Sequence, residues 1–135
     1  DVDPTAVRCA RINVLLNHMD ALIEIREGDL FAPVAGQRFH FVMFNPPFLR
    51  GAARGPYGSS WWSTDVMERF AAGLPTVLAP NGRALVLLST QGDEAGMLAA
   101  LAGQQLHGQP LVRKDLGNEV ITVYGVRRSG ADGAP

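Results

Sequence analysis

Polar and apolar residues along the chain recur with the two periods expected of helices and strands. In residues 5–17, apolar residues spaced three and four apart share one face of a predicted helix: Val7, Ala10 and Val14. Asp3 and Pro4 form a typical helix start, in which an N-cap residue is followed by a first-turn proline. We expect this helix to end at Asn17 and His18.

Three further segments have strand patterns. Residues 21–29 alternate, with Ile23 and Ile25 on one side, which predicts a short strand. Residues 39–44 (FHFVMF) and 83–90 (RALVLLST) are built mainly of apolar residues, which is typical of strands that are buried on both faces of a parallel sheet.

Two more helices are predicted between and after these strands. Asp65 suits the N-cap of a helix that carries four apolar residues inward: Val66, Met67, Phe70 and Leu74. Pro75 should kink or restart that helix. Asp93 suits the cap of another helix that runs to about His107.

The remaining segments read as connections and a hairpin. Residues 49–63 lack periodicity and predict a long loop, and residues 80–82 (Pro-Asn-Gly) predict a turn. Residues 110–116 and 119–128 predict two strands joined by a tight turn at Gly117 and Asn118.

Strands that alternate with helices predict an α/β fold with a mostly parallel sheet covered on both faces. The closing hairpin would place one antiparallel strand at or near the C-terminal edge of the sheet. At 135 residues the chain can bury one core but not two. We therefore expect residues 1–128 to belong to one domain and residues 129–135 to form a disordered tail.

Composition narrows the class of protein. The chain is 47% hydrophobic and 19% charged, as globular proteins are, and its net charge of −1 argues against a strongly basic nucleic-acid-binding protein. The single cysteine, Cys9, excludes an internal disulfide and favours a reducing, cytoplasmic location. No apolar run approaches the ~20 residues that span a bilayer, so we expect no membrane association. The separate positions of His18, His40 and His107 lead us to expect no metal site.

Ligands of such sheets bind beyond the carboxyl ends of the strands. Residues 1–3 (Asp-Val-Asp) precede the first helix, where a strand would have just ended. Residues 28–31 (Gly-Asp-Leu-Phe) and residues 45–48 (Asn-Pro-Pro-Phe) follow two predicted strands. One acidic strand end is a weak signal, but three such segments in this order and spacing are specific.

On these segments the chain resembles class I S-adenosylmethionine-dependent methyltransferases that methylate planar nitrogen groups. It is most similar to the HemK-like group, which modifies the glutamine of translation release factors. DVDPTAVRCARIN resembles the segment after the second strand of that family, EGDLF its adenine-binding corner and NPPF its catalytic motif. DVMERF and LAPNGRALVL resemble a later helix and strand of the group. The resemblance extends to about Arg128 and implies a Rossmann-like fold.

The resemblance also implies S-adenosylmethionine as the cofactor. The residues it assigns to the cofactor are Asp1, Val2, Asp29, Leu30 and Asn45. The Asp1 carboxylate would accept hydrogen bonds from both ribose hydroxyls, which a carboxylate can do. Asp29 would accept a hydrogen bond from the adenine amino group beside the Leu30 backbone. The alternative interpretation of Asp29 is a turn cap.

The catalytic residues implied are Asn45, Pro46, Pro47 and Phe48. The lone pair of a planar amide or aromatic amine is delocalised, so its methylation needs positioning more than a strong base. The Asn45 side-chain oxygen and the Pro46 carbonyl can each accept one hydrogen of the target NH2 and aim the lone pair at the methyl group. The two prolines stiffen the loop, and Phe48 offers a face for stacking. The alternative is a strand-ending turn with a buried phenylalanine.

The family's glycine-rich loop, between its first strand and first helix, has no counterpart in this sequence. We therefore expect the first strand and this loop to lie upstream of Asp1, so that the chain is an N-terminally truncated piece of the fold. We also expect residues 1–135 in isolation to bind the cofactor weakly or not at all.

The acceptor of the methyl group stays open between two classes of substrate. The fourth residue of the motif is Phe48. In the family, tyrosine is common at this position in glutamine modifiers, whereas phenylalanine is frequent among modifiers of RNA bases. Tyr57, Trp61 and Trp62 could stack a flipped base, line a protein groove or pack the loop onto the domain. The near-neutral charge favours a protein substrate such as a release factor, with an exocyclic amine of RNA or DNA as the alternative. An inactive scaffold and an NAD-dependent dehydrogenase are further alternatives, and neither accounts for residues 45–48.

Overall fold

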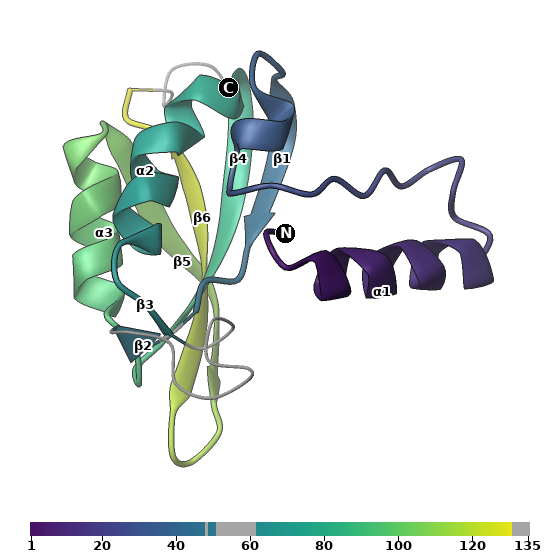
Figure 1. Cartoon of the computed structure of the whole chain (residues 1–135). Coiled ribbons are helices and arrows are strands. Elements are labelled where there is room, and N and C mark those ends of the chain that lie inside the picture. Colours follow the sequence, from purple (N-terminus) through teal and green to yellow (C-terminus); the bar gives the residue numbers. More distant parts are fainter. Residues whose placement is uncertain (48, 51–61, 131–135) are drawn as a thin grey trace. The chain divides into compact units, whose positions relative to one another are not determined.

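A computed structural model describes residues 1–47, 49–50 and 62–130, with only the backbone described at 49–50 and 62–63 (Figure 1). The chain divides into two compact units, an N-terminal unit of residues 1–36 and a C-terminal unit of residues 37–135. Each unit has its own organisation.

The N-terminal unit begins with helix α1 (Pro4–Leu16). The Asp3 side chain accepts a hydrogen bond of 2.7 Å from the backbone nitrogen of Thr5, which confirms the predicted cap. Val7 is buried, and Ala10 and Val14 are half-buried, so the predicted apolar face of this helix is confirmed. Asn17 caps the carboxyl end, as expected.

Residues 21–29 do not form the predicted strand. Residues 23–27 are extended, but their only ladder-like partner among the described residues is Asp1. The Asp1 nitrogen donates to the Arg26 carbonyl at 3.3 Å, and the Gly28 nitrogen donates to the Asp1 carbonyl at 2.9 Å, which is the pattern of a parallel ladder. A strand requires such partners along its length, and here one residue supplies them. A short 3-10 helix, η1 (Ala32–Val34), follows.

The C-terminal unit contains a four-stranded sheet in the order β1-β4-β6-β5. Strands β1 (Phe39–Phe44) and β4 (Leu78–Ser89) are parallel, whereas β6 (Val120–Arg128) is antiparallel to both β4 and β5 (Leu106–Asp115). The predicted hairpin, with an antiparallel strand near the edge of the sheet, is therefore confirmed.

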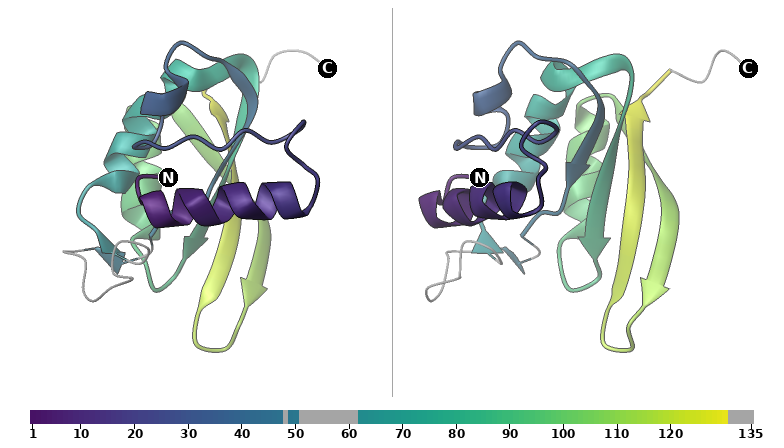
Figure 2. Two further views of the ribbon diagram at one scale, coloured as in Figure 1. Left: turned by 45° about the vertical axis from the view of Figure 1, so that its right-hand side comes forward. Right: turned by 90° about the vertical axis from the view of Figure 1, so that its right-hand side faces the viewer.

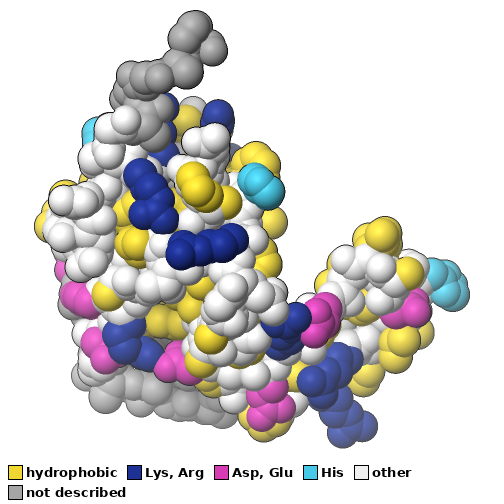
Figure 3. Space-filling view, turned by 90° about the horizontal axis from the view of Figure 1, so that it is seen from above, with side chains coloured by type: hydrophobic (Ala, Val, Ile, Leu, Met, Phe, Trp, Pro, Cys, Tyr) yellow, Lys and Arg dark blue, Asp and Glu magenta, His cyan; other side chains and the backbone are white. Residues whose placement is uncertain are grey.

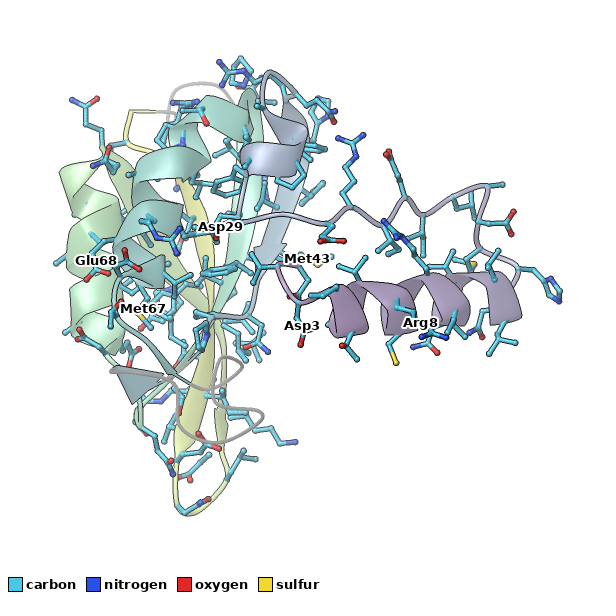
Figure 4. All side chains as sticks on the ribbon, in the orientation of Figure 1. Asp3, Arg8, Asp29, Met43, Met67 and Glu68 are labelled. Carbon is cyan, nitrogen blue, oxygen red and sulfur yellow. The ribbon has the colours of Figure 1, made fainter. Side chains whose placement is uncertain are left out.

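Two helices of this unit, α2 (Val66–Val77) and α3 (Glu94–Gly103), lie side by side on one face of the sheet (Figures 1 and 2). Alternate β4 residues on that face, Ala84, Val86 and Leu88, are buried. Within this unit, the described helices leave the other face of the sheet open. The prediction that β1 is buried on both faces is wrong, because Phe41 is 67% and Met43 81% exposed (Figure 4).

Residues 80–82 do not form the separate turn that was predicted, because they lie inside β4. Their effect is a bulge: Phe39 pairs with Leu78, but Phe41 pairs with Arg83. A Cβ atom on Gly82 would lie 2.7 Å from the Phe39 carbonyl oxygen, so the bulge requires glycine at this close approach.

Helix α2 continues through Pro75 and ends directly at β4. Two arginines bind its last carbonyls: Arg38 donates to Pro75 at 2.9 Å and to Leu78 at 3.3 Å, and Arg128 donates to the same atoms at 2.8 and 3.1 Å. Carbonyls at a helix end lack helical partners, so cations there are favourable. Basic side chains gather on this end of the C-terminal unit (Figure 3).

The other predictions for this unit are refined by the structure. The Asp93 side chain caps α3 by accepting from the Gly96 nitrogen at 2.9 Å, as predicted, but α3 ends at Gly103, before His107. The predicted loop over residues 49–63 has short paired ends, β2 (Leu49–Arg50) and β3 (Trp62–Ser63). Across the described ranges, no helix combines the length and the apolar character that a membrane span needs.

Candidate functional site

The predicted site residues fall into two groups, one in each unit. Asp1, Val2, Asp29 and Leu30 belong to the N-terminal unit, and Asn45, Pro46 and Pro47 belong to the C-terminal unit. Three others, Phe48, Tyr57 and Trp61, lie outside the described residues, as does the side chain of Trp62 in β3.

The two predicted cofactor-binding segments of the N-terminal unit lie side by side. The hydrogen bond from the Gly28 nitrogen to the Asp1 carbonyl joins residue 1 to the residue that precedes Asp29. The hydrogen bonds of Asp1 with Arg26 and Gly28 therefore bring Asp1 close to Asp29, although the two residues are far apart in the sequence. Segments distant in sequence thus meet at one end of an extended segment.

Asp1 and Val2 are exposed at the start of α1. The Asp1 Oδ1 atom accepts a hydrogen bond of 2.9 Å from the Asp3 nitrogen, which fixes the orientation of the carboxylate. A carboxylate has about four lone-pair sites, so this one can still accept hydroxyl hydrogens from a ribose. The role that the sequence suggested for Asp1 stays a prediction.

Residues 28–34 form a tight corner after the extended segment. Gly28 has φ +149°, and a Cβ atom there would lie 2.3 Å from Pro33 Cγ, so the corner requires glycine. Leu30 has φ +42°, which is unusual for a bulky residue. The Ala32 nitrogen donates to the Asp29 carbonyl at 3.0 Å and closes the turn. Strained residues cluster at ligand sites, which supports a functional interpretation of this corner.

An arginine that the sequence analysis did not consider holds the corner. The Arg26 Nη1 atom donates to the Pro33 carbonyl at 2.9 Å. Its Nε atom donates to Oε1 of Glu24 and its Nη2 atom to Oε2, both at 2.7 Å. The hydrogen bonds from Arg26 lower the pKa of Glu24 and keep it ionised. The signal available in the sequence was the Glu-x-Arg spacing, which puts both side chains on one side of an extended segment.

The end of β1 carries the second group. Phe44 stacks on Phe70 of α2, with ring centroids 3.9 Å apart and planes 6° from parallel. Phe70 is 1% exposed, so the stack anchors the last residue of β1 in the core. Directly after it, Asn45 is exposed and Pro46 is buried. The strand thus presents the Asn45 amide to solvent at its carboxyl end, where ligands of parallel strands bind.

The neighbouring strand β4 ends in a hydrogen-bonded polar cluster that the sequence analysis also missed. Phe44 pairs with Val86, so β4 continues three residues further, to Ser89. The buried Ser89 hydroxyl donates to Glu119 at 2.5 Å and accepts from the Gln91 nitrogen at 3.1 Å. These contacts tie the turn between β5 and β6 to the carboxyl end of β4.

Among the described residues, no group of three or more His, Cys, Asp or Glu side chains is placed to hold a metal ion.

Residues 1–105 match the model of the family described as "Methyltransferase small domain". A tRNA1(Val) (adenine(37)-N6)-methyltransferase of Porphyromonas gingivalis is 27% identical over 62% of the chain and 36% of that protein. A release factor glutamine methyltransferase of Aquifex aeolicus is 37% identical over 36% of the chain and 17% of that protein. A ribosomal RNA large subunit methyltransferase F of Stutzerimonas stutzeri is 32% identical over 78% of the chain and 34% of that protein.

The chain thus spans about a third or less of the length of these relatives. Among solved structures, a ribosomal protein L11 methylase of Lactobacillus delbrueckii superposes with a TM-score of 0.68 at 15% identity, over 96% of the chain and 55% of that structure. A TehB-like SAM-dependent methyltransferase of Corynebacterium glutamicum superposes with a TM-score of 0.59 at 16% identity, over 92% and 64%. These similarities confirm the predicted Rossmann-like α/β fold.

Proposed function

This chain belongs to the methyltransferase small domain family, and we propose that it is part of an S-adenosylmethionine-dependent N-methyltransferase that acts on a planar amide or amine. The observation that carries the proposal is the end of β1. There the stack of Phe44 on Phe70 holds the strand, and the exposed Asn45 follows at once.

The N-terminal unit supports the choice of cofactor. Asp1 offers carboxylate oxygens suited to a ribose diol, and the corner that contains Asp29 and Leu30 is joined to it by the Gly28 hydrogen bond. When bound, S-adenosylmethionine supplies a methyl group on a positively charged sulfur. The residues of this unit hold the adenosine part, through Asp1, Val2, Asp29 and Leu30.

The chemistry of the C-terminal unit is the positioning of an NH2 group. The Asn45 side-chain oxygen and the Pro46 carbonyl accept its two hydrogens, and Pro47 restricts the loop. The bound cofactor would supply the methyl group, and the nitrogen positioned in this way would accept it and release one proton to solvent. Phe48 stacks on the flat target group.

We favour a protein glutamine as the acceptor, such as that of a release factor. Acidic residues of the C-terminal unit lie at the helix starts and hairpin turn beside the carboxyl ends of β1 and β4: Asp65, Glu68, Asp93, Glu94, Asp115 and Glu119. Three basic residues of the same elements, Arg69, Arg113 and Lys114, lie among them, and Arg69 pairs with Asp65 at 3.2 Å. The remaining excess of acidic side chains disfavours a phosphate backbone. The second candidate is an exocyclic base amine, which the similarity to a tRNA adenine N6-methyltransferase supports.

The test is transfer of a labelled methyl group from S-adenosylmethionine to a cell extract by the full-length protein. Asn45→Ala should abolish the label, while Asn13→Ala, an exposed asparagine on α1, should leave it unchanged. Protease-sensitive label supports the glutamine acceptor, and nuclease-sensitive label transfers the assignment to a base amine. Label that persists in Asn45→Ala contradicts the role of Asn45. Cofactor binding without any transfer favours the inactive scaffold.

A further inference from the structure

We infer that Arg26 is a positioning residue for the cofactor, which holds the corner of residues 28–34 in the conformation that meets the adenine. The inference rests on the proposed function, since it concerns the same cofactor site. It assigns the shape of that site to a side chain that does not itself touch the ligand.

Two of the hydrogen bonds that hold the corner lie at its two ends. At its start, the Gly28 nitrogen donates to the Asp1 carbonyl at 2.9 Å, and at its far side the Pro33 carbonyl accepts from Arg26 Nη1 at 2.9 Å. Asp29 and Leu30 lie between these two points. A loop attached at both ends has fewer accessible conformations, so the order of its middle residues depends on both attachments.

The Arg26 side chain is itself oriented. Its Nε and Nη2 atoms form a bidentate pair with Glu24, at 2.7 Å for each bond. This fork fixes the plane of the guanidinium and leaves Nη1 aimed at Pro33. Glu24 therefore acts on the corner through Arg26, whose side chain it orients.

The corner needs such support because its backbone is unfavourable. Leu30 has φ +42° and Gly28 has φ +149°, and Pro33 lies where a Cβ atom of residue 28 would be. A strained conformation persists only when its surroundings hold it. Without the bond to Pro33, we expect Leu30 to relax to a negative φ and the Leu30 N–H to turn away from the ligand.

If Arg26 were only a structural residue at the surface, its loss would change the stability of the protein and not its affinity for the cofactor. The Arg26 side chain is 31% exposed and Glu24 is 70% exposed, and ion pairs of this kind contribute little to global stability. Loss of Arg26 should therefore change the affinity for the cofactor much more than the melting temperature.

The experiment measures the dissociation constants of S-adenosylhomocysteine and of methylthioadenosine, by calorimetry, for the full-length protein and its variants. Arg26→Ala should weaken both ligands by the same factor, about tenfold or more, as residues that support a ligand-binding group do. Methylthioadenosine lacks the amino-acid part, so an equal loss locates the defect at the adenosine. Arg26→Lys, which cannot form the fork, should lie between Ala and wild type.

The matched control is Arg8→Ala, an exposed arginine on α1 (Figure 4), which should leave both constants unchanged. Amide hydrogen exchange of the ligand-free protein should show faster exchange at residues 29–34 in Arg26→Ala. If Arg26→Ala fails to fold, Glu24→Gln tests the same arrangement by removing the charged partner that orients Arg26, and we expect a smaller loss of affinity.

Wild-type affinity in Arg26→Ala, or in both Arg26→Lys and Glu24→Gln where Arg26→Ala does not fold, overturns the inference and leaves the proposed function standing. A wild-type protein that binds neither ligand overturns the proposed function together with the inference.

Discussion

The two units of the chain differ in the kind of interaction that stabilises each of them internally. Among the described residues, every buried apolar side chain except Val7 belongs to the C-terminal unit. The N-terminal unit instead owes its conformation to polar contacts, namely the Asp3 cap, the bonds of Asp1 to Arg26 and Gly28, and the Arg26–Glu24 pair.

The predicted site residues of the two units therefore depend on different energetic contributions. Apolar burial contributes about 25 cal/mol per Å², whereas exposed polar contacts have small net effects. The end of β1 is therefore held by the core, and the corner of residues 28–34 depends on local contacts. Regions with few buried apolar contacts open locally, and a ligand that binds the closed form stabilises them.

The largest expected effect is in the core of the C-terminal unit. Phe70→Ala removes a ring that is 1% exposed and that stacks on Phe44, so it should cost about 3–5 kcal/mol of unfolding free energy. Urea denaturation of wild type and variant measures this loss. Phe41→Ala is the control, because Phe41 is 67% exposed on the same strand as Phe44 and should cost much less. Equal losses of unfolding free energy in the two variants would contradict the distinction between the buried and the exposed face of β1.

A smaller effect, confined to the N-terminal unit, is expected at the corner. Gly28→Ala introduces a contact of 2.3 Å with Pro33 Cγ, so it should cost about 1–3 kcal/mol of local stability. Hydrogen exchange at residues 28–34 should accelerate, while the protected amides of β4 and β6 stay unchanged. Gly36→Ala is the comparison, since a Cβ atom on Gly36 (φ +79°) would meet no atom within 4 Å, so alanine there would strain the backbone without a steric clash. Faster exchange throughout both units of Gly28→Ala would show that the units unfold together.

The smallest expected effect concerns a polar contact inside the C-terminal unit. The hydroxyl of Tyr124 donates to Glu94 at the start of α3, and this bond raises the pKa of Tyr124 to about 12 from an ordinary value of 10. A raised pKa of the folded state means that the contribution is complete below pH 10 and is lost as the pH rises through 12. Tyr124→Phe should lose about 1 kcal/mol at pH 7 and show a weaker decline of stability between pH 10 and 12. The same alkaline decline in both proteins would contradict this assignment.

Local features of the chain were predictable because their causes are local. The caps at Asp3 and Asp93 follow from side chains that bond to nitrogens two and three residues away. The hairpin turn follows from Gly117, which has φ +89°. Helix α1, β1 and β6 were expected close to their observed ranges for the same reason, whereas β5 begins at Leu106, before the predicted start at residue 110.

Features that depend on what packs against a segment were not predictable in this way. The pattern of residues 39–44 identified a strand, but Phe41 and Met43 are exposed because α2 and α3 cover one face only within that unit. Likewise, residues 21–29 alternate as a strand does, yet one partner residue lies beside them. A period in the sequence determines which side chains share a face, and it does not determine what covers that face.

By itself the sequence determined the α/β fold class, the family resemblance and the three segments at which cofactor and substrate residues were expected. Only the tertiary structure joined Asp1 to Gly28, stacked Phe44 on Phe70 and brought Arg26 to Pro33. The physical reason is the range of the interactions. Periodicity, capping and turn preferences act over a few residues, whereas these three contacts require the folded backbone to bring their partners together.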